Sequence, residues 1–244
     1  MILKRQFDII ASFFGLLLLW PVLLVTAVLI KIKMPGGPAF FCQKRVGKDG
    51  KLFTCHKFRS MLVAPKVEKG KEGRESREGK ESNPSTDSGT ANGWSSVSVA
   101  GDSRITPFGA KLRHYKIDEL PELWDVLIGK MSFVGPRPDV PGYADKLEGD
   151  DRDVLKLRPG ITGPATLKYR LEDEMISAYV AERHATGDTR DSQVIAVEYN
   201  DTVIYPDKVR LNKYYYEHYS FLKDIEMIFA TVLGKKVQYA GEEI

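Results

Sequence analysis

The chain has 244 residues and carries 36 Lys and Arg against 33 Asp and Glu, so its formal net charge is only +3. This balance argues against bulk nucleic-acid binding, and two cysteines with four scattered histidines provide neither a disulfide framework nor the ligand spacing of a zinc site. The length allows either one domain with its own core or a small domain with appendages.

The first predicted element is an uncharged segment of membrane-spanning length. Residues 9–30 carry no charge, and pairs of cations flank them on both sides. As one helix they would rise about 33 Å, which matches the hydrocarbon core of a bilayer. The balanced flanks favour neither orientation of a simple span, and Pro21 favours a kink. The residues leave two topologies open for a membrane anchor at 1–34: a re-entrant helix that returns to the same face, and an ordinary kinked transmembrane helix.

A hairpin and a long polar insertion follow the anchor. Residues 39–61 have the pattern of two strands joined by a turn at Gly47-Lys48-Asp49-Gly50. Residues 65–103 are rich in Lys, Glu, Gly, Ser and Asn and almost lack large apolar side chains. Such a segment cannot bury enough surface to offset its chain entropy, so we expect a flexible insertion whose charges are solvated.

Helical patterns dominate the rest of the chain. Apolar side chains recur at helical spacing over 120–127, and Gly129 suits the end of that helix. We expect further elements as follows: helices over 143–157 and 172–185, a short strand over 198–205, and an amphipathic helix over 221–232 that ends at Gly234. The last helix has an apolar stripe that suits either the core or a membrane interface.

The most informative polar motif is the acidic pair Asp118-Glu119, which precedes Leu120-Pro121. Proline is tolerated in the first turn of a helix, so the pair is expected near a helix N-terminus, where carboxylates stay ionised and phosphate is attracted. An ionised carboxylate there can attack phosphorus, and its neighbour can hold Mg²⁺. The plainer interpretation is that the two acids only cap a helix.

Two arginine-bearing turns favour the chemical interpretation. Gly135-Pro136-Arg137-Pro138 and Arg158-Pro159-Gly160 each hold a guanidinium on a stiff backbone. A planar guanidinium can bond two phosphate oxygens at once, although arginines in such turns are often only structural. Together with the acidic pair and the anchor, they indicate an anionic, lipid-linked substrate.

Four ordered motifs also carry a resemblance to a known family. They are Lys57-Phe58-Arg59-Ser60-Met61, Asp118-Glu119-Leu120-Pro121, the segment 131–138 (MSFVGPRP) and the segment 158–163 (RPGITG). In this order they resemble the bacterial sugar transferases, which are small monotopic phosphoglycosyl transferases that begin cell-surface glycan assembly. The resemblance covers nearly the whole chain, apart from 65–103 and part of 170–205.

The resemblance implies an activity and a set of site residues. Such enzymes transfer a sugar 1-phosphate from a UDP-sugar to undecaprenyl phosphate and release UMP, through a covalent aspartyl-phosphosugar intermediate. By position, Asp118 is implied as the nucleophile and Glu119 as the ligand of Mg²⁺, with Asp118 beside it at the metal. The implied substrate-binding residues are Lys57, Arg59, Arg113, Arg137, Arg158 and Asp224.

The expected fold is α+β: an N-terminal re-entrant membrane helix kinked at Pro21, then a small cytoplasmic domain of amphipathic interfacial helices and short antiparallel strands. The resemblance favours the re-entrant topology, although Trp20 stands where the family usually has serine. Residues 35–244 would form the catalytic domain, on the cytoplasmic face of a bacterial inner membrane. Its expected partners are a UDP-sugar, undecaprenyl phosphate, membrane lipid and downstream glycosyltransferases, and no nucleic acid. The product would enter capsule, O-antigen or exopolysaccharide synthesis.

Two other functions compete with this one. A catalytically silent membrane adaptor would use the acidic pair as a helix cap and the insertion as a partner contact. A lipid-phosphate hydrolase would need an activated water, and typically a metal cluster or a histidine base, neither of which the sequence pattern indicates. Measuring UMP release distinguishes a transferase from both.

Overall fold

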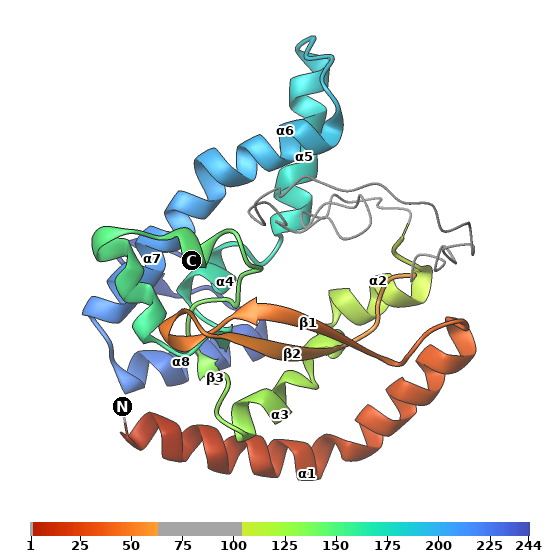
Figure 1. Cartoon of the computed structure of the whole chain (residues 1–244), viewed down its shortest axis with the longest axis vertical. Helices are drawn as coiled ribbons and strands as arrows, with labels where there is room; N and C mark the ends of the chain where they lie inside the picture. The colour runs from red at the N-terminus through yellow and green to blue at the C-terminus, as the bar shows by residue number, and fades with distance from the viewer. Residues whose placement is uncertain (1, 63–103) are drawn as a thin grey trace, which may run out of the picture.

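The structure is a computed structural model that describes residues 2–62 and 104–244, so the predicted insertion at 65–103 lies outside the described residues. Its main elements are helices and short strands (Figure 1). In chain order they are α1 (Ile2–Lys33), β1 (Phe40–Val46), β2 (Leu52–Phe58), α2 (Pro107–His114), α3 (Glu122–Leu127), β3 (Ser132–Val134), β4 (Gly160–Thr162), α4 (Pro164–Lys168), α5 (Glu172–Ala185), α6 (Ser192–Tyr199), α7 (Tyr205–Glu217), α8 (Phe221–Leu233), β5 (Gln238–Tyr239) and β6 (Glu242–Glu243).

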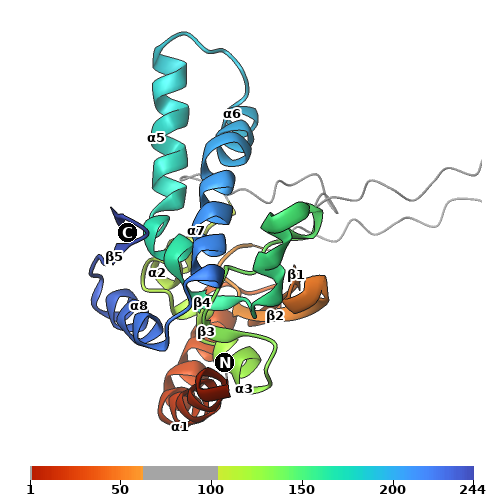
Figure 2. The ribbon, with the colours of Figure 1, turned by 90° about the vertical axis from the view of Figure 1, so that its left-hand side faces the viewer.

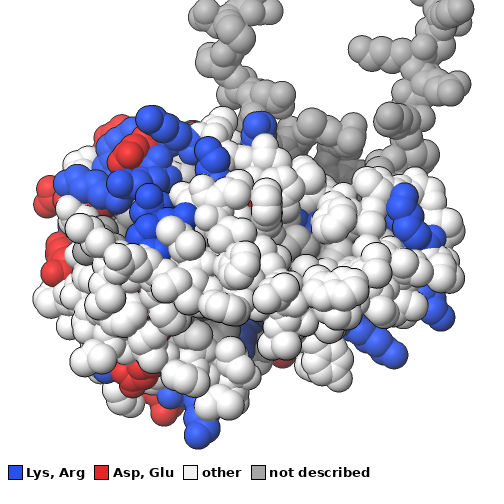
Figure 3. Space-filling view, turned by 90° about the horizontal axis from the view of Figure 1, so that it is seen from below, with Lys and Arg blue, Asp and Glu red and all other residues white. Residues whose placement is uncertain are grey.

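Among the described residues, α1 is the helix long and apolar enough to cross a membrane, with a mean hydropathy of 2.6 over its best window. It is one helix that contains Pro21, and Figure 1 shows that it curves along its length. Seen from below, the face that includes α1 has a broad uncharged area, with Lys, Arg, Asp and Glu at its margins (Figure 3). The presence of a membrane-type helix is therefore confirmed, whereas its re-entrant path stays a prediction.

Both ends of α1 are attached to the rest of the chain. Near the start, the Lys4 ammonium lies 2.6 Å from the Asp224 carboxylate of α8, and the Arg5 guanidinium donates to two carbonyls at the end of α3, over 2.7 and 2.8 Å. Near the other end, Ile30 is completely buried in a cluster with Phe58 of β2. The helix thus runs along the domain, and Figures 1 and 2 show it beneath the other elements.

The predicted hairpin is confirmed. Strands β1 and β2 pair antiparallel from Phe40 opposite Phe58 to Val46 opposite Leu52. The turn between them contains Asp49 and Gly50 with positive φ values of 58° and 73°, as the Asp-Gly pair suggested. The hairpin matters for the site because β2 carries Lys57.

The second strand pair corrects the expectation of antiparallel strands. β3 and β4 are parallel, with Ser132 opposite Gly160 and Val134 opposite Thr162. The backbones approach so closely that a Cβ at Gly160 would lie 2.2 Å from the amide nitrogen of Gly135. Only glycine fits there. The two arginine-bearing turns also contact each other through their backbones, since the Gly160 amide donates to the Pro136 carbonyl over 2.8 Å.

Helices α7 and α8 enclose the main core with β3, α4 and the C-terminal strands. The amphipathic helix expected over 221–232 is confirmed as α8, and it ends at Gly234 in the left-handed region. Its outer face leaves Leu222, Phe229 and Val232 exposed. The buried members of the core are Val134, Leu157, Leu167, Tyr215, Met227, Ala230, Val237, Tyr239 and Ile244.

The helix predicted over 172–185 is confirmed as α5, and it forms an arm with α6 that projects away from α1 (Figure 2). The strand predicted over 198–205 is wrong. These residues finish α6, form a π-helical turn over Asn200–Ile204 and begin α7. Their β-branched and aromatic side chains favour strands locally, but Ile204 is completely buried against α5 and α6, and this packing outweighs the local preference.

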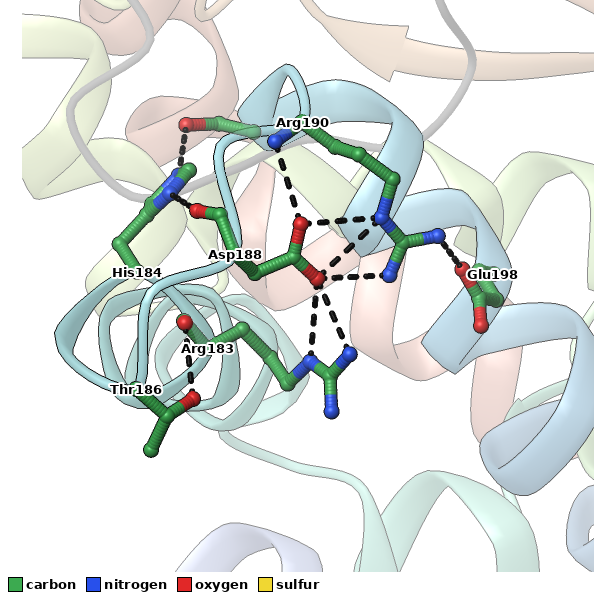
Figure 4. Close-up of polar contacts among 7 residues, drawn as sticks. Arg183, His184, Thr186, Asp188, Arg190 and Glu198 are labelled. Atoms are coloured by element: carbon green, nitrogen blue, oxygen red, sulfur yellow. Dashed lines mark hydrogen bonds and ion pairs between the residues drawn. The ribbon is translucent and has the colours of Figure 1, made fainter.

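The arm ends in a self-contained polar cluster (Figure 4). The Asp188 carboxylate forms ion pairs with the guanidinium groups of Arg183 and Arg190, at 3.0 and 2.7 Å, and Arg190 also forms an ion pair with Glu198. His184 bonds the Asp188 carbonyl. Because these groups satisfy one another at an exposed position, they hold the turn between α5 and α6 and leave little for another ligand.

The helix predicted over 143–157 is wrong as a single α-helix. The segment contains two separate 3₁₀ stretches, Ala144–Lys146 and Gly149–Lys156. The second stretch starts at Gly149, whose φ of 55° does not fit the interior of a right-handed helix, so one continuous helix cannot pass through it. The apolar spacing correctly predicted which residues are buried, since Val154 and Leu155 face the interior. It did not predict the type of helix.

Candidate active site

The acidic pair lies in a 3₁₀ turn, Ile117–Glu119, one turn before α3. Lys116 precedes it in the left-handed conformation, with φ 55° and ψ 22°, and this change of direction turns both acids inward. Pro121 caps the start of α3, which begins at Glu122. The pair is therefore upstream of the helix and not within its first turn, so a dipole of a six-residue helix is a minor influence on it.

Glu119 is held by two cations. Lys57 Nζ and an Arg137 guanidinium nitrogen each lie 2.8 Å from its Oε1. Burial alone would raise the pKa of Glu119, but the charges of Arg137 and Lys57 outweigh burial and hold the pKa well below its usual range. The carboxylate is thus ionised at neutral pH, and two of the predicted substrate-binding cations are gathered on it.

Asp118 differs from its neighbour. Burial, together with the nearby charge of Glu119, raises its pKa to about 6, and Lys57, Lys116 and Arg113 only partly oppose the shift. Its Oδ1 is buried and has no hydrogen-bond partner among the described residues. A buried carboxylate that is unpaired and still mostly ionised at pH 7 is a strong candidate for a nucleophile or a ligand.

Two further acids, which we did not identify from the sequence, support the pair from α3. Glu122 is 2% exposed and accepts from Lys57 at 3.0 Å, so Lys57 bridges it to Glu119. Asp125 is completely buried and accepts from both the backbone amide and Nδ1 of His56, at 2.9 and 2.8 Å. The spacing of three residues from Glu119 to Glu122 to Asp125 was a usable signal, because it places acids on one helix face.

A cavity of about 1230 Å³ opens beside the pair. Glu119 and Arg137 line its polar part, whereas Asp118 is not among its lining residues. Its apolar part reaches Leu19 of α1 and Val232 of α8, which belong to the elements with the exposed apolar side chains. The cavity thus connects a charged site with the side of the molecule where α1 and α8 expose apolar side chains.

Arg113 also lines this cavity, where it lies 2.6 Å from Asp173 at the start of α5. The other predicted binding residues are not brought to the acidic pair. Arg59 is buried and donates to the Met34 carbonyl at the end of α1. Arg158 donates to the Gly129 carbonyl over 3.0 Å, behind α3.

Asp224, the remaining predicted substrate-binding residue, is 2% exposed and lies away from the cavity. It accepts from Lys4 at 2.6 Å and from the Tyr215 hydroxyl at 2.5 Å. These contacts give Arg59, Arg158 and Asp224 positions that hold the anchor and the turns, and their substrate-binding role stays a prediction without geometric support.

A second polar wall of the cavity was not predicted. The Tyr205 hydroxyl lies 3.3 Å from Oδ2 of Asp139, and Lys208 Nζ lies 2.7 Å from both carboxylate oxygens of Glu172. All four side chains line the cavity. Burial raises the pKa of Asp139 to about 6, although Lys208 and Arg45 oppose the shift. The signal in the sequence was weak, because Asp139 follows the arginine turn directly but Tyr205 comes from a segment predicted as a strand.

The donor set of the pair fits a magnesium ion. Lys57 and Arg137 both contact Oε1 of Glu119, which leaves Oε2 for another ligand, and Oδ1 of Asp118 is unpaired within the described residues. Mg²⁺ is commonly bound by one or two carboxylates together with substrate phosphates. The part of the chain that the structure describes has no cluster of three or more His, Cys, Asp or Glu that could hold a metal, so phosphate ligands would be needed.

The sequence matches a family model and several known proteins. A family model described as bacterial sugar transferase matches residues 1–236. The chain is 30% identical over 231 residues to the UDP-galactose-lipid carrier transferase of Erwinia amylovora, and 39% identical over 165 residues to the undecaprenyl-phosphate galactose phosphotransferase of Salmonella typhimurium. These matches cover 94% and 66% of the chain but only 39% and 31% of those relatives. The exopolysaccharide production protein PSS of Rhizobium leguminosarum bv. phaseoli is 32% identical, and the match covers 99% of the chain and 98% of that relative.

Proposed function

The chain belongs to the bacterial sugar transferase family, and on that premise we propose that it transfers a sugar 1-phosphate from a UDP-sugar to undecaprenyl phosphate and releases UMP. The names of two relatives describe phosphotransfer of galactose and of N-acetylgalactosamine to undecaprenyl phosphate. Two others take part in exopolysaccharide production, and we place the reaction at the start of such a cell-surface pathway.

One observation carries the proposal: two adjacent buried carboxylates have opposite electrostatic surroundings beside a cavity that reaches the lipid-facing helices. Glu119 is fixed by Lys57 and Arg137, while Oδ1 of Asp118 has no partner among the described residues. If the two acids only capped a helix, their carboxylates would accept hydrogen bonds from backbone amides. Neither acid has such a bond among the described contacts.

The proposed chemistry has two steps. A carboxylate oxygen of Asp118 attacks the phosphorus that bears the sugar, the bond from this phosphorus to UMP breaks, and UMP leaves with the electron pair. A phosphate oxygen of undecaprenyl phosphate then attacks the same phosphorus, and the bond to Asp118 breaks, which restores the carboxylate. The two-step route suits this cavity because the soluble donor and the lipid acceptor need not be bound together.

The cations around the pair have defined tasks in this scheme. Arg137 lines the cavity and stands against Glu119, so it is placed to offset negative charge on a bound diphosphate. Lys57 keeps Glu119 and Glu122 in position through contacts of 2.8 and 3.0 Å. We propose that Glu119 and Asp118 bind Mg²⁺, which would neutralise phosphate charge when bound.

The contacts of α1 support a re-entrant anchor. A helix of 32 residues is about 48 Å long, yet Lys4 near its start and Ile30 near its end are both packed on the same domain. A straight span would carry these ends to opposite faces of the bilayer. We therefore propose that the helix enters and leaves on one face, with the catalytic domain on the cytoplasmic face of the inner membrane.

The decisive experiment follows UMP release and covalent adducts. Purified wild-type protein in lipid or detergent receives a panel of UDP-sugars with Mg²⁺, with and without undecaprenyl phosphate. We expect UMP release with one donor and, without the lipid, an intact mass increased by one sugar phosphate. Asp118→Asn should abolish both signals, and a cooperative melting transition at or above the wild-type temperature would verify that this variant is folded. Ample UMP release by that variant would exclude Asp118 as the nucleophile.

The same assay separates the competing functions. A membrane adaptor would release no UMP with any donor. A lipid-phosphate hydrolase would release free phosphate or sugar phosphate without forming a sugar-linked lipid. Either result would overturn the proposed function.

A further inference from the structure

The cavity has a polar wall that the proposed transfer chemistry does not use. Asp139 and Tyr205 meet there at 3.3 Å, beside the Lys208–Glu172 ion pair. Both side chains are partly buried, so they are neither core nor free surface. A polar wall of a cavity that already carries a charged site is a candidate for contact with the substrate itself.

Asp139 is held firmly and close to the acidic pair. Its carbonyl accepts from the amide of Val46 at 2.9 Å, which ties the turn to the end of β1. It follows Arg137 by two residues, so the two Cα atoms are at most about 7 Å apart. Arg137 in turn contacts Glu119. The Asp139 carboxylate is therefore positioned near, but not at, the phosphate-binding cations.

Tyr205 is placed by an unusual stretch of backbone. It is the first residue of α7 and directly follows the π-helical turn Asn200–Ile204. Such turns often occur at functional sites, because they rotate the next side chain out of helical register. The ring is also fixed by an edge contact with Tyr143, at 5.0 Å between centroids. The hydroxyl is thus directed to Asp139 by both backbone and packing.

The chemistry of this wall suits sugar hydroxyls. A carboxylate accepts hydrogen bonds, and a tyrosine hydroxyl both donates and accepts. The diphosphate would be repelled by this wall, because the carboxylates of Asp139 and Glu172 outnumber its one cation, Lys208. In a nucleotide sugar, the sugar is bonded directly to the phosphorus that Asp118 would attack, whereas the uridine is separated from it by a second phosphate.

We infer that Asp139 and Tyr205 bind hydroxyl groups of the donor sugar and so determine which UDP-sugar the enzyme accepts. This inference rests on the proposed function. It assigns the uridine and the diphosphate to other parts of the cavity, where Arg113 and Arg137 supply positive charge.

The test compares Asp139→Asn and Tyr205→Phe with the wild type on pairs of donors that differ at one hydroxyl, such as UDP-glucose and UDP-galactose, and their N-acetylated counterparts. Loss of a hydrogen bond between the donor sugar and the Asp139 carboxylate or the Tyr205 hydroxyl should change the ratio of kcat/KM within a pair by about tenfold. Inhibition by UMP should stay unchanged, because UMP lacks the sugar. The matched control is Asp201→Asn, since Asp201 also accepts from a tyrosine, Tyr143 at 3.0 Å, but is exposed and outside the cavity.

Three results would overturn the inference. The first is an unchanged ratio of kcat/KM between the two donors in both variants, even if activity falls equally for both donors. That result would mean that Asp139 and Tyr205 only stabilise the fold. The second is weakened inhibition by UMP in proportion to the loss of turnover, which would assign the wall to uridine. The third is a changed ratio in Asp201→Asn. A wild-type protein that releases no UMP from any donor would instead refute the proposed function, so the two failures are distinguishable.

Discussion

Replacing Asp118 by Asn should make the protein inactive and also more stable at neutral pH. The side chain is buried, and burial with the neighbouring Glu119 raises its pKa to about 6 from an ordinary value of 3.8. The native state therefore binds a proton more tightly than the unfolded chain does. Below about pH 4 the Asp118 carboxyl is protonated in both states and does not reduce the free energy of unfolding. As the pH rises toward 6, the unfolded chain loses this proton first, and the free energy of unfolding falls. Asparagine resembles the protonated acid at every pH, so the variant avoids this loss.

The magnitude follows from the size of the shift. About two pKa units correspond to about 3 kcal/mol, so the variant should exceed the wild type by roughly 3 kcal/mol at pH 7.5 and by about 1 kcal/mol at pH 4.5. For a chain of this length, 3 kcal/mol corresponds to a rise of about 6–12 °C in the melting temperature.

Thermal melting in one detergent across pH 4.5–7.5 measures this difference. EDTA is included so that the charges around residue 118 are those of the protein alone. Asp201→Asn makes the same chemical change at an exposed position and should melt like the wild type. Two results would refute the view that the buried, ionised Asp118 carboxylate destabilises the native state. One is an Asp118→Asn variant that melts no higher than the wild type at pH 7.5, and the other is a difference in melting temperature that does not grow with pH.

Two further predictions concern the anchor. Lys4→Met leaves the Asp224 carboxylate, which is 2% exposed, without its cation, and should destabilise the protein by about 3 kcal/mol or more. Adding Asp224→Asn should restore most of the lost melting temperature. A double variant that melts no higher than Lys4→Met would argue against a buried ion pair. In sealed vesicles of a Cys42→Ser background, single cysteines at the exposed positions Gln6 and Lys51 should react with an impermeant reagent from the same side, whereas opposite sides would contradict the re-entrant path.

The elements set by local patterns could be predicted from the sequence, and those set by distant packing could not. The hairpin, α5 and α8 follow from turn residues and apolar spacing that act within one segment. The segment 198–205 was misassigned because its strand-forming residues are overruled by burial of Ile204 against the arm. The segment 143–157 failed at one glycine, Gly149, whose positive φ interrupts the helix.

The candidate site shows the same division. Glu119, Lys57 and Arg137 were identified from motifs, and the structure places the Lys57 and Arg137 cations each 2.8 Å from the Glu119 carboxylate. Arg158 and Asp224 were named by the same reasoning, but their contacts are with the chain itself. A motif records which residue types occur together, and it does not distinguish a residue that touches substrate from one that holds a turn.

The attachment of Arg5 has a consequence for anyone who wishes to obtain this protein without lipid. Its guanidinium donates to two backbone carbonyls where α3 ends, and α3 carries Glu122 and Asp125, the two acids that support the pair Asp118-Glu119. Deleting the hydrophobic N-terminus would leave those carbonyls and Asp224 without their cations, besides uncovering the apolar surface beneath. A truncated, water-soluble version is therefore expected to lose the architecture of its reaction centre, and solubility would have to be engineered by changing the outward side chains of the first helix while retaining its inward polar ones.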